Sequence, residues 1–218
     1  MIKVENLNYI IKDKKILKNV SFDIPKNSVT LLIGPNGAGK TTTLELIAGI
    51  RKNNNESLQL INKNYKVLLL DSSYLIFDEL TAHEFLSFIS ELNNVSINYL
   101  NDVIKEFRKI NVHSFLGTRL KHLSKGEKQK LVFMTAFLSN ADILLFDEPF
   151  NGLDIYSLKI IKEMLNIYKN KYTFVIATHD VHDFSTYVDS CIILKEGEVK
   201  KQLFKSKEGD IFECKYDN

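Results

Sequence analysis

The stretch GPNGAGKTT, residues 34–42, places glycines, a lysine and a threonine at the spacing G-x-x-x-x-G-K-[ST]. Glycines let the backbone curl so that successive N–H groups point at a phosphate, and the positive end of a following helix favours the same anion. The lysine can reach the β- and γ-phosphates of a nucleotide, and the threonine hydroxyl can bind Mg²⁺. The candidate phosphate-binding residues are Gly34, Pro35, Asn36, Gly37, Ala38, Gly39, Lys40, Thr41 and Thr42. The alternative, a glycine-rich turn that only caps a helix, does not explain why an apolar strand pattern precedes the motif.

A pair of adjacent carboxylates, Asp147 and Glu148, follows the apolar run ILLF. A buried strand that ends in carboxylates presents them at the edge where parallel sheets bind ligands. Asp147 is therefore a candidate to hold Mg²⁺ through water, and Glu148 is a candidate to polarise an attacking water. The alternative interpretation is a solvated strand end.

Apolar strand patterns alternate with helical patterns along the chain. The expected buried strands are SVTLLIG, KVLLL, DILLFDEP and YTFVIATHD, and the expected helices are KTTTLELIAGI, TAHEFLSFISEL to about FRKI, LVFMTAFL and SLKIIKEMLNIY. This alternation predicts an α/β fold with a mainly parallel core sheet covered on both faces. The stripe Phe85, Phe88, Ile89 and Leu92 is expected to be core.

Shorter patterns add an antiparallel β lobe near the N-terminus and a helical lobe at roughly residues 81–139, within a single domain of residues 1–218. VSFDI reads as a strand joined to SVTLLIG by a turn at Pro25-Lys26-Asn27, and RKNNNES reads as a loop. CIILKEGEVKKQ predicts a hairpin that turns at Glu196-Gly197. SKGE predicts a capping box in which Ser124 and Glu127 exchange hydrogen bonds at the start of a helix.

The composition limits which partners the chain can have and which cellular compartment suits it. Among 218 residues, 29 Lys and Arg oppose 27 Asp and Glu, and this net charge of +2 gives no basic footprint for nucleic acid. Two cysteines, Cys191 and Cys214, are too few for a disulfide framework and indicate a reducing compartment. No apolar run approaches the roughly 18 residues that a membrane span requires. The N-terminal MIKVENLNYIIKDKK lacks the apolar core of a signal peptide.

Taken together, these motifs resemble those of the nucleotide-binding subunit of an ATP-binding cassette (ABC) transporter, a P-loop NTPase, over nearly the full chain. HLSKGE is similar to the family signature LSGGQ, with Leu123, Ser124, Gly126 and Glu127 at its first, second, fourth and fifth positions. NGLD, residues 151–154, is similar to the family's D-loop and places Asp154 at the aspartate position.

Two further positions match single family residues. His179 follows the strand YTFVIAT, where the family has a switch histidine that contacts the γ-phosphate. Tyr9 lies 25 residues before Gly34, where the family has an aromatic residue that stacks on adenine. The alternatives are an ordinary strand residue for Tyr9, a satisfied polar residue for His179, and turn formers for Asn151 and Asp154.

Three departures from the family pattern stand out. The family glutamine that touches Mg²⁺ or water is absent from KVLLLDSSYLIFDELT, where counting back from Leu80-Thr81 places Ser72. Ser72, or Asp71 as the alternative, is the candidate third metal contact. The signature carries Lys125 and Glu127 where the family has glycine and glutamine, and the D-loop begins with Asn151 instead of serine.

The resemblance implies an ATPase that uses ATP and Mg²⁺ and closes head to tail with a second nucleotide-binding subunit, in a homodimer or heterodimer. It further implies a separate integral membrane permease, docked near SSYLIFDELT and the helical lobe, export as the direction, and a place on the cytoplasmic face of the membrane. The catalytic candidates are Glu148, His179 and Lys40. Two rival readings are a soluble ABC ATPase without a transporter, and a nucleotide-gated binding module that scarcely hydrolyses ATP.

Overall fold

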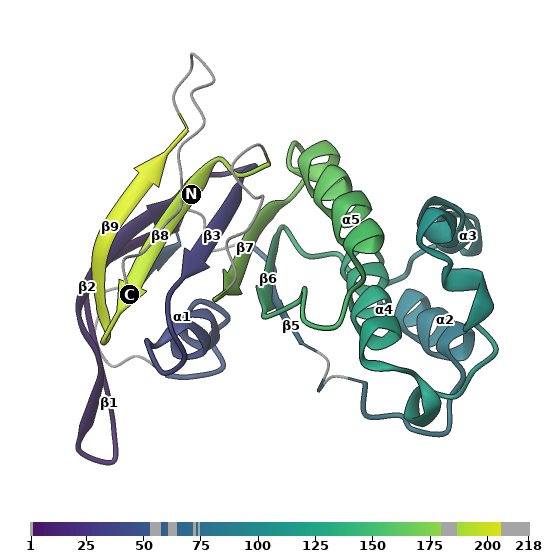
Figure 1. The fold of residues 1–218 in the computed structure, drawn as a ribbon, viewed down its shortest axis with the longest axis horizontal. Helices are drawn as coiled ribbons and strands as arrows, with labels where there is room; N and C mark the ends of the chain where they lie inside the picture. Colours follow the sequence, from purple (N-terminus) through teal and green to yellow (C-terminus); the bar gives the residue numbers. More distant parts are fainter. Residues whose placement is uncertain are drawn as a thin grey trace. The chain divides into compact units, whose positions relative to one another are not determined.

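The computed structural model describes residues 2–52, 58–60, 65–71, 73, 75–179 and 187–205, with the backbone alone for 58–60. Most of the predicted loop RKNNNES, the candidate Ser72 and Cys214 lie outside the described residues. The chain divides into two compact units. The sheet unit comprises Met1–Leu69, Asp142–Glu148 and Met164–Asn218, and the helical unit comprises Leu70–Ala141 and Pro149–Glu163. Figure 1 labels most of the helices and strands of each.

A six-stranded, mainly parallel sheet forms the centre of the sheet unit, as the sequence predicts. Its order is β5-β6-β7-β3-β8-β9, and the pairs β6–β7, β7–β3 and β3–β8 are parallel while β8–β9 is an antiparallel hairpin. The strands are β3 (Val29–Ile33), β5 (Val67–Leu70), β6 (Ile143–Asp147), β7 (Thr173–Thr178), β8 (Ser190–Lys195) and β9 (Glu198–Phe204). Every residue of β3 and β7 is buried, which explains their uninterrupted apolar sequence.

A second sheet of the same unit is antiparallel and joins β1 (Ile2–Ile11), β2 (Lys14–Ile24) and β4 (Leu58–Leu60) in the order β2-β1-β4. It confirms the predicted N-terminal antiparallel lobe. β1 has no clear strand pattern in its sequence, because bulges interrupt its pairing with β2 and break the strict alternation of buried residues.

One helix of the sheet unit, α1 (Lys40–Ile47), follows β3 and buries Leu44, Leu46 and Ile47. These side chains share one apolar cluster with residues of β2, β6 and β7 such as Leu17, Leu145 and Val175. Both sheets contribute to this cluster, so the packing of the core holds α1 against the ends of β3, β6 and β7.

The helical unit contains α2 (Ala82–Leu92), α3 (Ile97–Glu106) and α4 (Lys125–Phe137), together with the 3₁₀ turns η2 (Phe107–Ile110), η3 (Val112–Ser114) and η4 (Leu120–His122). Helix α5 (Ile155–Tyr168) begins in this unit. Capping boxes start both α2 and α4, at Thr81 and Ser124. None of the helices in the described part of the chain has the length and apolar character needed to cross a membrane.

The expectation that the α2 stripe is core is wrong for two of its residues. Phe85 is buried, but Phe88 is 36% exposed and Leu92 is 63% exposed. The inward face of α2 consists instead of Ala82, Phe85, Leu86 and Ser90. A spacing of i, i+3, i+4, i+7 marks an apolar face without saying how much of its width packs inside.

Candidate nucleotide site

The phosphate loop, residues 34–42, connects the buried strand β3 to α1 as the sequence predicts. Gly39 precedes the helix with φ +106, and among the described residues no side chain caps the helix start. The first amides of α1 are therefore available to an anion, because a helix cannot satisfy them internally.

Lys40 folds back into this loop. Its ammonium donates to the carbonyl oxygens of Gly34 at 2.8 Å and Pro35 at 3.3 Å, and its side chain is only 6% exposed. Glu148 Oε1 lies 3.4 Å from the same nitrogen. A buried ammonium needs such partners, because desolvation of an isolated charge is costly. The arrangement holds the charge of Lys40 inside the loop.

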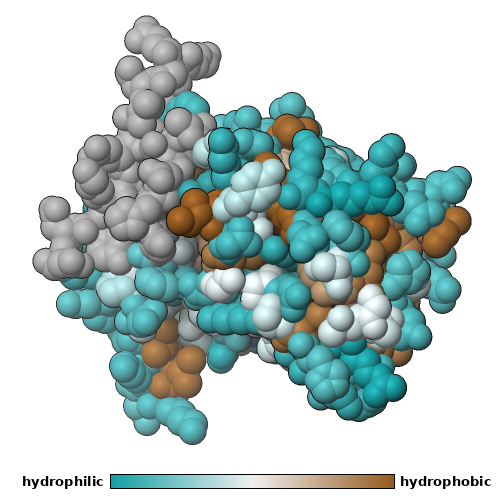
Figure 2. Space-filling view, turned by 45° about the vertical axis from the view of Figure 1, so that its right-hand side comes forward, coloured by the Kyte–Doolittle hydropathy of each residue, from teal (hydrophilic) through white to brown (hydrophobic). Residues whose placement is uncertain are grey.

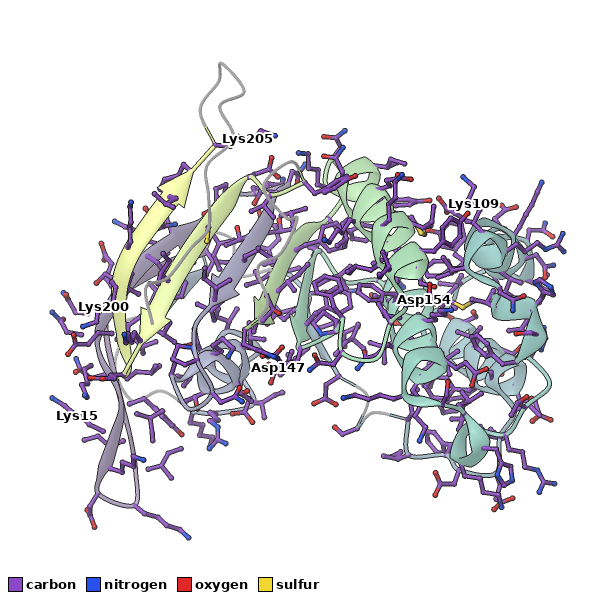
Figure 3. All side chains as sticks on the ribbon, in the orientation of Figure 1. Lys15, Lys109, Asp147, Asp154, Lys200 and Lys205 are labelled. Atoms are coloured by element: carbon purple, nitrogen blue, oxygen red, sulfur yellow. The ribbon has the colours of Figure 1, made fainter. Side chains whose placement is uncertain are left out.

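A hydroxyl and a carboxylate meet beside the loop. Thr41 Oγ1 donates to Asp147 Oδ2 over 2.6 Å, and Asp147 ends β6 (Figure 3). Oxygen ligands of this kind suit Mg²⁺, which keeps several waters and binds substrate phosphates instead of filling an all-protein cage. Thr41 and Asp147 therefore fit a magnesium ion.

Glu148 connects the loop to His179. Its Oε2 lies 2.9 Å from His179 Nδ1, and its backbone N–H donates to the Ala177 carbonyl at the end of β7. Glu148 also adopts φ +48, a conformation that costs energy for a residue with a side chain. The strand end thus aims a half-buried carboxylate between Lys40 and His179.

Tyr9 lies on β1, away from the contacts that join Lys40, Glu148 and His179. It pairs with Leu17 across the antiparallel sheet and packs against the core cluster. Arg51 hydrogen-bonds to Glu45 and to Tyr9, and these bonds, the one to Glu45 most of all, raise the pKa of its guanidinium. Tyr9 thus contacts a residue beyond the end of α1, although Leu17 itself reaches Gly39 of the phosphate loop. Its role on adenine stays a prediction.

The signature segment, residues 123–127, forms the start of α4. Glu127 N–H donates to Ser124 Oγ at 3.3 Å, and Ser124 N–H donates to Glu127 Oε2 at 2.8 Å, which confirms the predicted capping box. Gly126 faces the NGLD loop, residues 151–154. A Cβ placed on Gly126 would lie 2.4 Å from the Gly152 carbonyl oxygen.

Asp154 holds the start of α5. Its carboxylate accepts from the Ser157 N–H at 2.8 Å and from Ser157 Oγ at 2.6 Å, and Lys130 Nζ lies 3.3 Å away. These contacts lower the pKa of Asp154 to about 2, and the hydrogen bond from the Ser157 hydroxyl contributes most. Lys130 also donates to the Ile110 carbonyl at 3.0 Å.

Lys130 carries no sequence signal that marks it as a site residue. It lies on α4, six residues after Ser124. Its contacts with Asp154 and the Ile110 carbonyl arise only because α4 packs beside the NGLD loop. Of the candidate third metal contacts, Ser72 lies outside the described residues. Asp71 belongs to the helical unit and accepts from the Ser73 N–H at 2.6 Å.

Apart from Tyr9, Asp71 and Ser72, the predicted site residues fall into two groups, one in each unit. The sheet unit brings together Lys40, Thr41, Asp147, Glu148 and His179. The helical unit brings the signature segment against the NGLD loop.

Comparisons with known proteins identify the family. A family model described as ABC transporter matches residues 17–151. An ABC transporter ATP-binding protein of Methanocaldococcus jannaschii is 32% identical, over 90% of this chain and 75% of that protein. The ABC-type transporter ATP-binding protein EcsA of Bacillus subtilis is 32% identical, over 92% of this chain and 85% of that protein.

A solved structure described as the ATP binding subunit of an ABC transporter shares 26% sequence identity and superimposes with a TM-score of 0.82, covering 93% of this chain and 89% of that one. The fold, the order of the motifs and these matches agree with one another. The chain belongs to the ABC transporter family, as one of its ATP-binding ATPase subunits.

Proposed function

We propose that this chain is the motor subunit of a transporter, which dimerises head to tail around MgATP and drives a separate integral membrane permease. The observation that supports it most is the cluster of Lys40, Glu148 and His179 beside the Thr41–Asp147 pair. This cluster contains a cation for phosphates, a carboxylate for water and a place for Mg²⁺. The resemblance implies that the signature segment of a second subunit completes this half-site.

In the proposed reaction the phosphate loop binds the β- and γ-phosphates through its amides, and Lys40 exchanges the Gly34 and Pro35 carbonyls for phosphate oxygens. Thr41 and Asp147 would hold Mg²⁺, which supplies neutralising charge to those oxygens when bound. Glu148 accepts a hydrogen bond from the attacking water, while its contact with His179 fixes its direction. Water oxygen bonds to the γ-phosphorus, the bond to the ADP oxygen breaks, and the water proton passes to the released phosphate.

The signature segment supplies the groups that complete a site on a second copy of the nucleotide-binding subunit. Ser124 is exposed and its hydroxyl caps α4 without being buried, so it can turn toward an anion. The helix start adds a favourable dipole. ATP bound to one subunit is thus expected to hold the signature segment of the other, and hydrolysis releases it.

The proposed permease contact is an apolar patch on the helical unit. Ile76 is 72% exposed, Phe77 is 41% exposed, and the Phe77 and Phe88 rings meet with centroids 5.3 Å apart. Leu92 extends the same helix face. Figure 2 shows brown apolar patches between hydrophilic side chains on the side turned toward the viewer. Such patches are typical of interaction sites. Docking there places the chain on the cytoplasmic face of the membrane through its partner.

One relative illustrates the proposed assembly with other transporter subunits. A Clostridium perfringens structure, 25% identical with a TM-score of 0.74, is described as part of the ABC transporter complex cbiONQ. We propose export as the direction. The support for export is the compact form with DELTAHEFLSFISEL after β5, which resembles export-type subunits, whereas a relative 29% identical is described as a spermidine/putrescine import ATP-binding protein of Acetivibrio thermocellus. Transport into inside-out vesicles containing the permease that co-purifies with this chain tests the direction, and net efflux from them would contradict export.

Phosphate release by the purified chain tests the catalytic assignment. Glu148→Gln is expected to slow release by about 100-fold or more, because it removes the carboxylate that orients water. Glu91→Gln changes an exposed glutamate of α2 and should leave the rate unchanged. A wild type no faster than Glu148→Gln would contradict the assignment and favour the nucleotide-gated binding module.

Ser124→Asp tests the signature half separately. Aspartate caps helices as well as serine does, so the fold should persist. The added negative charge should oppose the γ-phosphate of the second subunit and abolish ATP-driven dimerisation, followed by sedimentation. Ser96→Asp makes the same change at the cap of α3 and serves as control. Equal dimerisation of both variants would exclude a role for Ser124 in ATP binding.

A further inference from the structure

The turn between β8 and β9 bonds directly to the phosphate loop. It turns at Glu196-Gly197, as the sequence predicts, with φ +53 and +79. The Gly197 N–H donates to the Ala38 carbonyl of the phosphate loop at 3.2 Å. The Gly197 carbonyl accepts from the Lys18 N–H of β2 at 2.8 Å. Figure 1 shows this turn at the same end of the sheet as the segment that leads from β3 into α1.

The space at Gly197 is closed by backbone. A Cβ there would lie 2.2 Å from the Ile16 carbonyl oxygen and 3.0 Å from its carbon. Ile16 belongs to β2, a strand fixed by its pairing with β1 and by buried Leu17. A side chain at residue 197 would therefore have to push the turn away from β2, and the Ala38 contact would move with it.

The same hairpin touches the first residue of the phosphate loop. A Cβ on Gly34 would lie 2.0 Å from the Leu194 carbonyl oxygen, so β8 packs on the bare backbone there. The Leu194 side chain also approaches Gly39, next to Leu17. Because the Gly34 carbonyl accepts from Lys40, a shift of β8 would also move the group that holds the lysine.

We propose that the β8–β9 turn is a positioning element for nucleotide binding, with Gly197 as its positioning residue. The hairpin holds the phosphate loop at Gly34 and again at Ala38, so the loop amides point at the phosphates before ATP arrives. Such preorganisation raises affinity because the ordering is done in advance. This inference rests on the proposed nucleotide site, and its test separates the two.

ATP affinity of Gly197→Ala, measured by equilibrium dialysis below its unfolding temperature, is the primary readout. Gly49→Ala is the matched control, because Gly49 also has a positive φ, +72, but a Cβ there meets nothing within 4 Å. We expect Gly197→Ala to weaken ATP binding by about 10- to 100-fold, because the phosphate loop would have to be ordered when ATP binds. Gly49→Ala should bind like the wild type, even where its unfolding temperature falls similarly.

Lys40→Ala distinguishes failure of this inference from failure of the proposed site. Normal binding by Lys40→Ala would overturn the nucleotide site itself. Lost binding by Lys40→Ala together with normal binding by Gly197→Ala would overturn only the role of the turn. Equal losses in Gly197→Ala and Gly49→Ala would also overturn it, since both would then reflect stability.

Hydrogen exchange in the wild type provides a test that does not depend on folding of a variant. Coupling is reciprocal, so ATP should strengthen the contact that strengthens ATP binding. We expect ATP to slow exchange at the Gly197 amide about fivefold or more. The Lys205 amide, which bonds the Asp189 carbonyl at the far end of the hairpin, should not change. Unchanged exchange at Gly197 with ATP bound would contradict the proposal.

Discussion

Gly126 of the signature segment lies against the carbonyl of Gly152 in the same chain. A Cβ on Gly126 would come within 2.4 Å of that oxygen, so bare backbone is required there before any nucleotide binds. The glycine thus has a structural role within one subunit, besides the approach to a phosphate that the resemblance implies. The start of α4 and the NGLD loop are joined as one surface.

Gly126→Ala is therefore expected to destabilise the chain without ATP. The cost should be about 1–3 kcal/mol, as for other side chains forced into filled space. Gly117→Ala is the control, because a Cβ on Gly117 meets nothing within 4 Å. Urea unfolding of both variants measures the difference. Equal stabilities would show that the contact with Gly152 yields easily.

Two variants of Lys125 distinguish a role of its charge from a role of its packing. Its aliphatic carbons would lie 3.1–3.3 Å from a Cβ on Gly152, so its stem covers the NGLD loop. Lys125→Met keeps most of that stem and removes the charge, whereas Lys125→Gly removes both. If the charge attracts the γ-phosphate, Lys125→Met should raise the ATP concentration for half-maximal dimerisation about threefold to tenfold. A change in Lys125→Gly alone would assign the residue to packing.

Lys130 links α4 to the NGLD loop through Asp154 and to η2 through the Ile110 carbonyl. Lys130→Met should cost about 1 kcal/mol, because the carbonyl loses a charged donor while the partly exposed ion pair adds little. Chemical denaturation measures this cost. Lys109→Met changes an exposed lysine of the same unit (Figure 3) and should stay within about 0.5 kcal/mol of the wild type.

The Asp154 carboxyl is expected to remain ionised in mild acid. The Ser157 hydroxyl and N–H bond its charged form and lower its pKa from 3.8 to about 2. A lowered pKa contributes stability above the unfolded pKa, and this contribution disappears as the pH falls through about 2. Carboxyl NMR should show no Asp154 titration between pH 7 and pH 3, and Ser157→Ala should raise the midpoint. A wild-type midpoint near 4 would contradict the contacts described.

The sequence was sufficient to predict the elements that carry strong local signals. The glycine-rich loop, the carboxylates after ILLF and the box at Ser124 depend on residues close in the chain, and the structure places each on the expected element. Parallel pairing of the core strands was predicted from their uninterrupted apolar sequences and their alternation with helices. The NGLD loop was instead expected from the resemblance to the family.

Contacts between distant segments could not be predicted in this way. Nothing in EGEV indicates that Gly197 bonds Ala38, because a turn sequence fits any hairpin. The partners of Lys130 depend on how α4 packs against the NGLD loop. Exposure of Phe88 and Leu92 likewise depends on how much of α2 its neighbours cover, which periodicity does not encode.

Head-to-tail closure is the central claim, and mixing two inactive variants tests it most directly. Lys40→Ala retains the signature segment and Ser124→Asp retains the phosphate loop, so only a mixed dimer contains one complete site. Phosphate release by an equal mixture should recover to at most about half of the wild-type rate, since neither variant dimerises alone and each mixed dimer has one complete site of two. A mixture no faster than the two variants measured separately would contradict a site shared between subunits.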